Sequence, residues 1–198
     1  EGGFSTVNTY DKAVLTWGFV QWTGGGGAAG ASDLTRALAI IKRVSPEAFA
    51  TRFRGFGIDV DDAGTTLSVT NAEGTTLTGE AAALAVQQSP ALTAVFSRAG
   101  LDADIQSGQL QAAAAEKITS VLALHVDVDP GKGKTMVRIG DVVTSEYGVG
   151  LLADHAIHGG AGGARDATKK GILAYLKEHP DVDAASPASW AADAEQYL

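Results

Sequence analysis

The residues best suited to chemistry lie in the first 22 positions of the chain. They comprise two carboxylic acids, three aromatic rings, a hydroxyl and an amide: Glu1, Tyr10, Asp11, Thr16, Trp17, Gln21 and Trp22. Cleavage of a glycosidic bond needs one carboxylic acid to protonate the leaving oxygen. It also needs a second polar or acidic group to position water or stabilise charge on the other face of the sugar. Glu1 and Asp11 supply such a pair.

Different surroundings give the two acids different expected roles. On the lip of an apolar, aromatic cleft, the charged form of Glu1 would be disfavoured by desolvation, so we expect Glu1 to stay protonated near neutral pH and to act as the acid. Asp11, on a wetter hairpin, is expected to stay ionised. Gln21 can bond to hydroxyl or N-acetyl groups of a glycan.

The aromatic residues of this segment have two possible functions. Tyr10, Trp17 and Trp22 can cover the apolar faces of sugar rings. The alternative is a purely structural hairpin, in which the tryptophans belong to the core and the two acids are solvated turn residues. Spacing alone leaves both interpretations open.

Four other patterns, for a dinucleotide site, a phosphate loop, a metal site and a serine hydrolase, are incomplete or lack the surrounding sequence that such a site requires. The glycines from 25 to 30 fit a dinucleotide-binding pattern, but the preceding segment does not read as a buried strand and no ribose-binding acid follows. Gly133-Lys134-Thr135 lacks the first glycine of a phosphate loop. His155 and His158 have the spacing of a shared metal site without the HExxH pattern, so no metal is expected. No nucleophile elbow for a serine hydrolase occurs.

Composition narrows the possible partners. The chain has 198 residues, no cysteine and a net charge of -8. This charge disfavours nucleic acids and anionic membranes, and the short apolar runs predict no membrane insertion. We expect no cofactor. The printed sequence contains no signal peptide and begins with Glu, as expected for a processed piece.

The hydrophobic pattern predicts an α+β domain that is mainly helical, with β structure near its front. Residues 4–22 are rich in Thr, Val and aromatics and predict a hairpin. A helix is expected to follow Ser32, with a stripe of Leu34, Leu38 and Ile41. Further helices are expected after three Ser-Pro pairs: Ser45-Pro46, Ser89-Pro90 and Ser186-Pro187.

The remaining elements follow from the same patterns. A small exposed hairpin is expected at about 65–78, around an Asn-Ala-Glu-Gly turn. A long Ala-rich helix is expected over 102–124, with an extended segment after it. Two amphipathic helices separated by the glycines of 159–163 complete the prediction.

The segment from 1 to 23 resembles the active-site segment of the lysozyme-like superfamily, which includes phage-type lysozymes and chitosanases. In phage-type lysozymes a Glu at a helix end precedes an Asp and then a Thr on a β-hairpin, and the matching positions here are Glu1, Asp11 and Thr16. The resemblance implies that Glu1 is the general acid and that Asp11 orients or polarises substrate or water. Thr16 would help to hold the attacking water. In the superfamily this Glu ends a helix, so either an upstream helix has been cut away from the printed sequence or the site is incomplete.

A second stretch, Arg138 to Gly160, is similar to a helix of bacterial peptidoglycan-hydrolase-like domains. This similarity implies that five residues lie near the cleft: Ser145, Glu146, Tyr147, Asp154 and His155. Among these, Tyr147, Asp154 and His155 would contact substrate. Asp154 is an alternative second carboxylate.

The resemblance predicts a single, two-lobed lysozyme-like catalytic domain over 1–198, with the N-terminal β-hairpin carrying the site. The expected activity is hydrolysis of peptidoglycan glycan strands in the cell wall, which implies a secreted or wall-delivered protein. A chitosanase is one alternative, because a cationic polymer suits an acidic protein. A non-catalytic wall-binding domain is the other.

Overall fold

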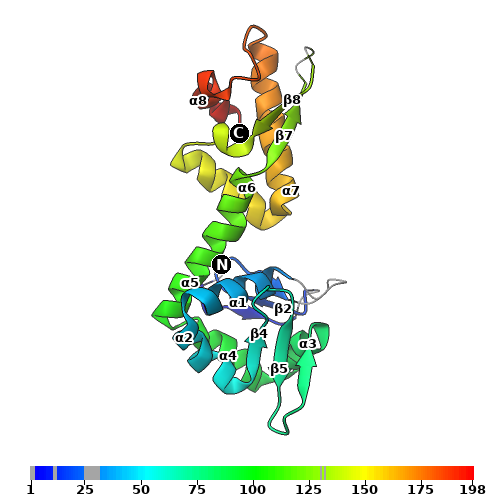
Figure 1. Cartoon of the computed structure of the whole chain (residues 1–198), viewed down its shortest axis with the longest axis vertical. Helices are drawn as coiled ribbons and strands as arrows, with labels where there is room; N and C mark the ends of the chain where they lie inside the picture. The colour runs from blue at the N-terminus through cyan, green and yellow to red at the C-terminus, as the bar shows by residue number, and fades with distance from the viewer. Residues whose placement is uncertain (1–2, 11–12, 25–31, 130, 132) are drawn as a thin grey trace. The chain divides into compact units, whose positions relative to one another are not determined.

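The chain forms two compact units, Glu1–Ala113 and Ala114–Leu198, and each unit has its own hydrophobic core. The computed structural model describes residues 3–10, 13–24, 32–129, 131 and 133–198. Within these ranges the fold is mixed α+β and mainly helical, with small antiparallel sheets (Figure 1). The predicted fold class is confirmed at this level.

The first sheet follows the start of the chain directly. Its strands β1 (Val7–Asn8), β2 (Leu15–Trp17) and β3 (Trp22–Gly24) pair antiparallel in the order β1-β2-β3. The hairpin predicted over 4–22 is therefore present, and a third strand extends it. The turn between β2 and β3 contains two positive φ angles, 82° at Gly18 and 57° at Gln21.

The second sheet contains the predicted exposed hairpin. Strands β5 (Leu67–Thr70) and β6 (Thr76–Thr78) lie where the hairpin at 65–78 was expected. A strand that the pattern did not predict, β4 (Ile58–Val60), pairs with β5 and completes an antiparallel sheet in the order β4-β5-β6. Alternation buries Leu67 and Val69 on the inner face of β5, as expected for a strand that is solvated on one side.

Three helices of the first unit begin at predicted positions. Helix α1 (Asp33–Val44) starts after Ser32, whose hydroxyl accepts the Thr35 N–H in a capping box. Helices α2 (Pro46–Arg52) and α4 (Pro90–Ala99) start at the predicted Ser-Pro pairs. The Ser89 hydroxyl caps α4 by accepting the Leu92 N–H, whereas the predicted cap at Ser45 is wrong, because its hydroxyl donates to the Asp104 carbonyl instead. The 3₁₀ turn η1 (Arg54–Phe56) follows α2. Helix α3 (Glu80–Gln88) was not predicted.

Trp17 lies in the centre of the first core. Its indole is fully buried and makes edge-on contacts with Phe53 and Phe96, with ring centroids 5.6 and 5.5 Å away. Its N–H donates to the Phe96 carbonyl at 2.9 Å. Aromatic residues of β2, of α4 and of the C-terminal cap of α2 therefore form one packed cluster.

The long helix expected over 102–124 is divided into three segments. Helix α5 (Ala103–Ala113) passes into the π-helical segment η2 (Ala114–Thr119) and then into α6 (Ser120–Leu122). The boundary between the two compact units coincides with the change from α-helical to π-helical geometry.

The second unit combines a hairpin with helices. Strands β7 (His125–Val128) and β8 (Thr135–Arg138) pair antiparallel and lead through η3 (Ile139–Asp141) into α7 (Glu146–Glu178). The break predicted within 159–163 occurs at Gly160, whose φ of 67° and ψ of 179° are not helical.

Short helical turns end the second unit. The third Ser-Pro pair starts only a 3₁₀ turn, η4 (Pro187–Ser189), followed by α8 (Ala191–Ala194) and η5 (Glu195–Tyr197). Trp190 is buried beside Tyr175 of α7, with ring centroids 5.8 Å apart. Throughout the described ranges, no helix has the length and apolar character needed to cross a membrane.

A pair of glycines tests how tightly η1 is fixed to β5. Gly57 and Gly74 both have φ near 80°, but a Cβ on Gly57 would overlap the Thr70 carbonyl oxygen, whereas nothing lies close to Gly74. We expect Gly74→Ala to lower the free energy of unfolding by about 1–2 kcal/mol through backbone strain alone. Gly57→Ala should lower it by at least about 3 kcal/mol, because the clash adds to the strain. Urea unfolding followed by circular dichroism measures both, and equal losses would refute the tight contact.

Candidate active site

The predicted site residues divide between the two compact units. Glu1 and Asp11, the two proposed acids, lie outside the described residues. Five members of the set belong to the first sheet and its loops: Tyr10, Thr16, Trp17, Gln21 and Trp22. The other three belong to α7 in the second unit: Tyr147, Asp154 and His155.

The sheet register places Thr16 at the middle of the first sheet. Thr16 lies on the central strand β2, where it is paired with Asn8 on β1 and with Thr23 on β3. The Thr16 side chain is nearly buried, with 4 % of the residue exposed. Its hydroxyl donates to the Gln21 Oε1 atom at 3.2 Å. The sheet thus holds this hydroxyl in one defined direction.

Gln21 closes the turn that follows Thr16. Its amide nitrogen donates to the Gly18 carbonyl at 2.7 Å, while its amide oxygen accepts from Thr16. A positive φ is uncommon for a residue with a side chain, and these two hydrogen bonds compensate for its strain. In this arrangement the Gln21 amide serves the turn rather than a glycan.

The two tryptophans of this segment do not lie where the sugar-stacking interpretation requires. Trp17 and Trp22 are 0 % and 1 % exposed, so neither indole presents a face to solvent. Trp22 packs edge-on against Phe19 at 5.6 Å, and Phe19 in turn contacts Phe4 at 4.9 Å. Both tryptophans are core residues, and their predicted role as sugar platforms needs correction. Large apolar rings are worth more to the fold when buried than when exposed.

Tyr10 is the exposed aromatic residue of the predicted set in the first unit. It is 89 % exposed, and its backbone N–H donates to the Asn8 Oδ1 atom at 3.0 Å. An exposed phenol ring one position before Asp11 in the sequence is compatible with stacking on a sugar.

Two glutamines that were not among the predicted site residues fix the segment from Phe4 to Thr9, which contains β1. Gln109 of α5 donates from Nε2 to the Phe4 carbonyl at 2.9 Å, and Gln87 of α3 donates to the Thr9 carbonyl at 2.8 Å. Between these anchors, the Gly18 N–H donates to the Thr6 carbonyl at 3.0 Å. The chain from Phe4 to Thr9 is therefore tied down at both ends.

The position of Gln109 in the sequence could have indicated its anchoring role. It lies four residues after Ile105 and three before Ala112, so it occupies the buried face of α5. A polar residue at a core position needs a partner for its amide. Its Nε2 has the Phe4 carbonyl, while its Oε1 has no hydrogen-bond partner among the described residues, as is also true of the Trp22 Nε1 atom.

The predicted residues of α7 are all exposed. Tyr147 is 77 % exposed and lies at the edge of a hollow of about 700 Å³, which is also lined by Ser145, Glu195 and Leu198. Glu195 accepts hydrogen bonds from the Ser145 N–H and hydroxyl, both at 2.9 Å. These bonds attach the C-terminal turn to the first turn of α7.

Asp154 lies seven residues after Tyr147 and therefore on the same face of the helix. Its carboxylate is 3.9 Å from the His158 Nε2 atom, while His155 is exposed beside it. Across the ranges that the structure describes, no three His, Cys, Asp or Glu side chains are grouped closely enough to hold a metal ion.

No protein-family model matches the chain, and neither does any curated protein or any solved structure. The function must therefore be inferred from the residues of this chain.

Substitutions of Gln109 test whether its amide anchors the start of the chain. We expect Gln109→Met to lower the free energy of unfolding by about 1 kcal/mol at every pH, because the bond to the Phe4 carbonyl is lost. In Gln109→Glu, burial would raise the pKa of the new carboxyl above its unfolded value of about 4.3.

The glutamate variant should therefore be nearly as stable as wild type below pH 4, where its protonated carboxyl can donate to Phe4. As the pH rises above 4, its free energy of unfolding should fall relative to wild type. Once the pH exceeds the raised pKa, the total loss should be about 1.4 kcal/mol for each unit by which the pKa is raised. Urea unfolding between pH 4 and 8 measures this difference. If the stability difference between Gln109→Glu and wild type did not change with pH, the carboxyl at this position would be open to water.

Proposed function

We propose that this chain is a lysozyme-like glycoside hydrolase that cleaves the glycan strands of bacterial peptidoglycan. Glu1 is the general acid, Asp11 orients or polarises substrate or water, and Thr16 helps to hold the attacking water. The whole chain would form a two-lobed catalytic domain over 1–198, acting without metal or cofactor. This function places the protein outside the cell or at the cell wall.

One observation carries the proposal. A short antiparallel sheet that begins at Val7 holds Thr16 on its central strand, and Asp11 lies in the sequence between β1 and that strand. A Glu followed by a hairpin that bears Asp and Thr is the order in the active-site segment of phage-type lysozymes. The glutamine anchors at Phe4 and Thr9 support the proposal further, because they fix the segment between the two acids.

The chemistry requires the two acids to differ in protonation. Glu1 must carry a proton at the start of the reaction and donate it to the leaving oxygen, while Asp11 must be ionised to stabilise positive charge or orient water. Fixed positions for these groups matter, because catalytic groups lower the barrier mainly when they are held in a reactive geometry. In an inverting enzyme the two carboxyl groups are about 6.5–9.5 Å apart, and in a retaining enzyme about 5–5.5 Å apart.

Substrate contacts in this proposal come from exposed side chains. Tyr10 replaces the two buried tryptophans as the aromatic platform of the first unit. Tyr147, Asp154 and His155 are candidates for contacts made by the second unit, since all three side chains are exposed. Glycan strands present both apolar ring faces and hydroxyl groups, which match such a set.

The net charge supports a second candidate substrate. Peptidoglycan is anionic, whereas chitosan is cationic, and the chain carries a net charge of -8. Long-range attraction therefore favours chitosan during encounter. A domain that binds wall glycan without cleaving it is the third candidate, because the core positions of Trp17 and Trp22 explain those residues without catalysis.

Glu1→Gln tests the proposed acid. We expect turnover to fall by at least about 100-fold, because the amide cannot donate the proton to the leaving oxygen. Binding to insoluble wall glycan should be retained. The assay is the release of new reducing ends from purified peptidoglycan and, in parallel, from chitosan.

Glu73→Gln is the matched control, since Glu73 lies on the exposed turn between β5 and β6. It should cleave like wild type. A wild-type protein that binds glycan but releases no reducing ends would support the binding domain instead. Faster release from chitosan than from peptidoglycan would support the chitosanase.

A further inference from the structure

A concave site lies in the first unit, and none of its lining residues belongs to the first sheet. It is a hollow of about 570 Å³ between η1, the start of β4 and the turn after β5. Its lining includes one exposed aromatic ring, two oppositely charged groups, an amide and a hydroxyl: Phe56, Arg54, Asp59, Asn71 and Thr70. The volume falls within the usual range for small-molecule sites.

Phe56 is the most unusual member of this lining. The residue is 53 % exposed, although the other phenylalanines of its neighbourhood, Phe49 and Phe53, are fully buried. A half-exposed ring at the edge of a hollow loses stabilisation that burial would provide, unless a ligand covers it. Its exposed face is an apolar surface about the size of a sugar ring.

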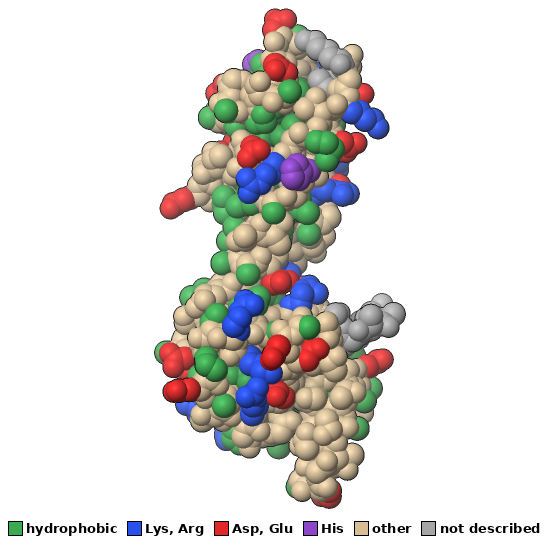
Figure 2. All heavy atoms as spheres, in the orientation of Figure 1, with side chains coloured by type: hydrophobic (Ala, Val, Ile, Leu, Met, Phe, Trp, Pro, Cys, Tyr) green, Lys and Arg blue, Asp and Glu red, His purple; other side chains and the backbone are tan. Residues whose placement is uncertain are grey.

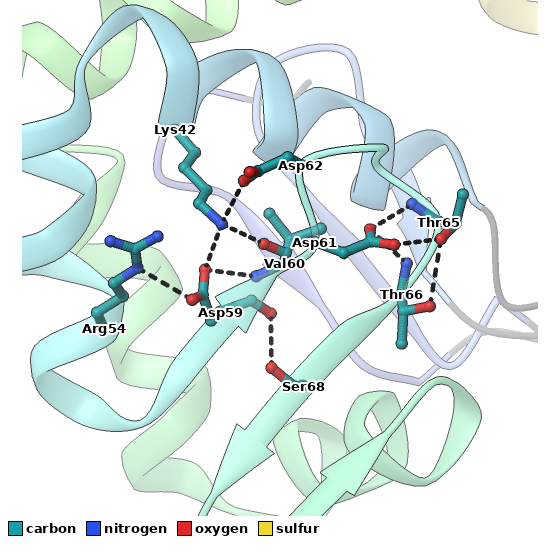
Figure 3. Close-up of polar contacts among 9 residues, drawn as sticks. All are labelled: Lys42, Arg54, Asp59, Val60, Asp61, Asp62, Thr65, Thr66 and Ser68. Carbon is teal, nitrogen blue, oxygen red and sulfur yellow. Dashed lines mark hydrogen bonds and ion pairs between the residues drawn. The ribbon is translucent and has the colours of Figure 1, made fainter.

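The polar groups around Phe56 are held in place. Figure 3 shows Arg54 and Asp59 pointing toward each other from η1 and β4, with the Arg54 Nε atom 3.0 Å from the Asp59 Oδ2 atom. The Asp59 Oδ1 atom accepts the Val60 N–H at 2.8 Å and is 3.2 Å from the Lys42 Nζ atom. Arg54 is thereby oriented through a carboxylate that is itself fixed.

Lys42 strengthens this arrangement. Its ammonium also contacts Asp62 at 2.9 Å and donates to the Val60 carbonyl at 2.6 Å. Burial lowers the pKa of Lys42, but the hydrogen bonds to Asp62 and Asp59 outweigh burial and raise the pKa above its usual value. Lys42 therefore stays charged and keeps Asp59 in position.

The backbone of the hollow is also preformed. Gly57 accepts the Thr70 N–H at 2.8 Å, and the close approach of Gly57 to Thr70 leaves no space for a Cβ. The Asn71 Oδ1 atom accepts the Thr75 N–H at 2.8 Å, while the described residues provide no acceptor for its amide nitrogen. A site that is already ordered loses little entropy when a ligand binds.

The chemistry of the lining selects one class of ligand. Arg54 and Asp59 cancel each other's charge, and Figure 2 shows acidic and basic side chains intermixed on the face of the first unit that it draws. A net-neutral lining favours neither an anion nor a cation. A purely apolar ligand would leave the guanidinium, amide and hydroxyl without partners, which is costly.

We propose that the hollow at Phe56 is an auxiliary glycan subsite that binds an uncharged pyranose ring. The ring would lie on Phe56, while the free N–H groups of Arg54 and the amide nitrogen of Asn71 donate to its hydroxyl oxygens. Arg54 uses only Nε in its bond to Asp59, and the described residues leave its terminal nitrogens available. The choice of a glycan as the ligand rests on the proposed function. The lining of the hollow includes neither Glu1 nor Asp11.

Binding of a neutral N-acetylglucosamine tetramer tests the subsite. Titrated into the ¹⁵N-labelled full chain carrying Glu1→Gln, it should shift the amide signals of Phe56, Gly57 and Asn71. Phe56→Ala should weaken binding by about fivefold to tenfold, the loss expected for one aromatic contact, while Phe56→Tyr, which keeps the ring, should bind like the parent. Leu77→Ala is the matched control, because Leu77 on β6 is a 42 % exposed apolar residue outside the lining.

Absence of shifts at these amides, or equal binding by Phe56→Ala and its parent, would overturn the subsite. The proposed hydrolase can fail separately. If Glu1→Gln leaves cleavage unchanged while Phe56→Ala weakens binding, the subsite stands and the assignment of Glu1 falls. If Glu1→Gln abolishes cleavage and Phe56 has no effect, only the subsite falls.

Discussion

The arrangement of the first unit depends on the burial of Trp17. Its indole is in contact with two phenylalanines and donates to a backbone carbonyl of α4, so strand β2 cannot shift without breaking both the packing and a buried hydrogen bond. Because successive side chains of a strand point to opposite faces, this burial places Thr16 on the other face, beside Gln21. A slip of one residue would exchange the two faces. The position of a candidate catalytic hydroxyl is thus a consequence of core packing.

Side-chain amides that donate to backbone carbonyls also fix the segment before β2. Gln109 and Gln87 come from different helices, and each ties down one end of the segment from Phe4 to Thr9. The hollow at Phe56 is stabilised differently, by an ion-pair network and by a glycine contact between η1 and β5. The first unit therefore contains two surfaces of defined shape, and each is supported by its own set of interactions.

Much of this architecture could be predicted from local signals in the sequence. Ser32 and two of the Ser-Pro pairs mark α1, α2 and α4, because a capping hydroxyl and a proline in the first turn both act locally. The glycines near 160 mark the break in α7, because glycine readily adopts the positive φ found at Gly160. The face of each aromatic residue could not be predicted, because Trp17 and Trp22 join a core whose other members lie mostly on helices and strands that follow later in the chain. Helix α3 was missed because it begins after Gly79, which has no side chain to cap it and marks no start in the sequence. The amide contacts of Gln87 and Gln109 span about eighty and a hundred residues, beyond the reach of any local pattern.

The burial of the tryptophans has a practical consequence for spectroscopy. All three indoles of the chain, at positions 17, 22 and 190, are at most 2 % exposed. Their emission should be blue-shifted and resistant to quenching by iodide or acrylamide in the folded protein. Intrinsic fluorescence will thus report on the integrity of the two cores, and it will be nearly blind to a carbohydrate resting on Tyr10 or Phe56. A flat fluorescence titration would carry no information about ligand affinity for this protein.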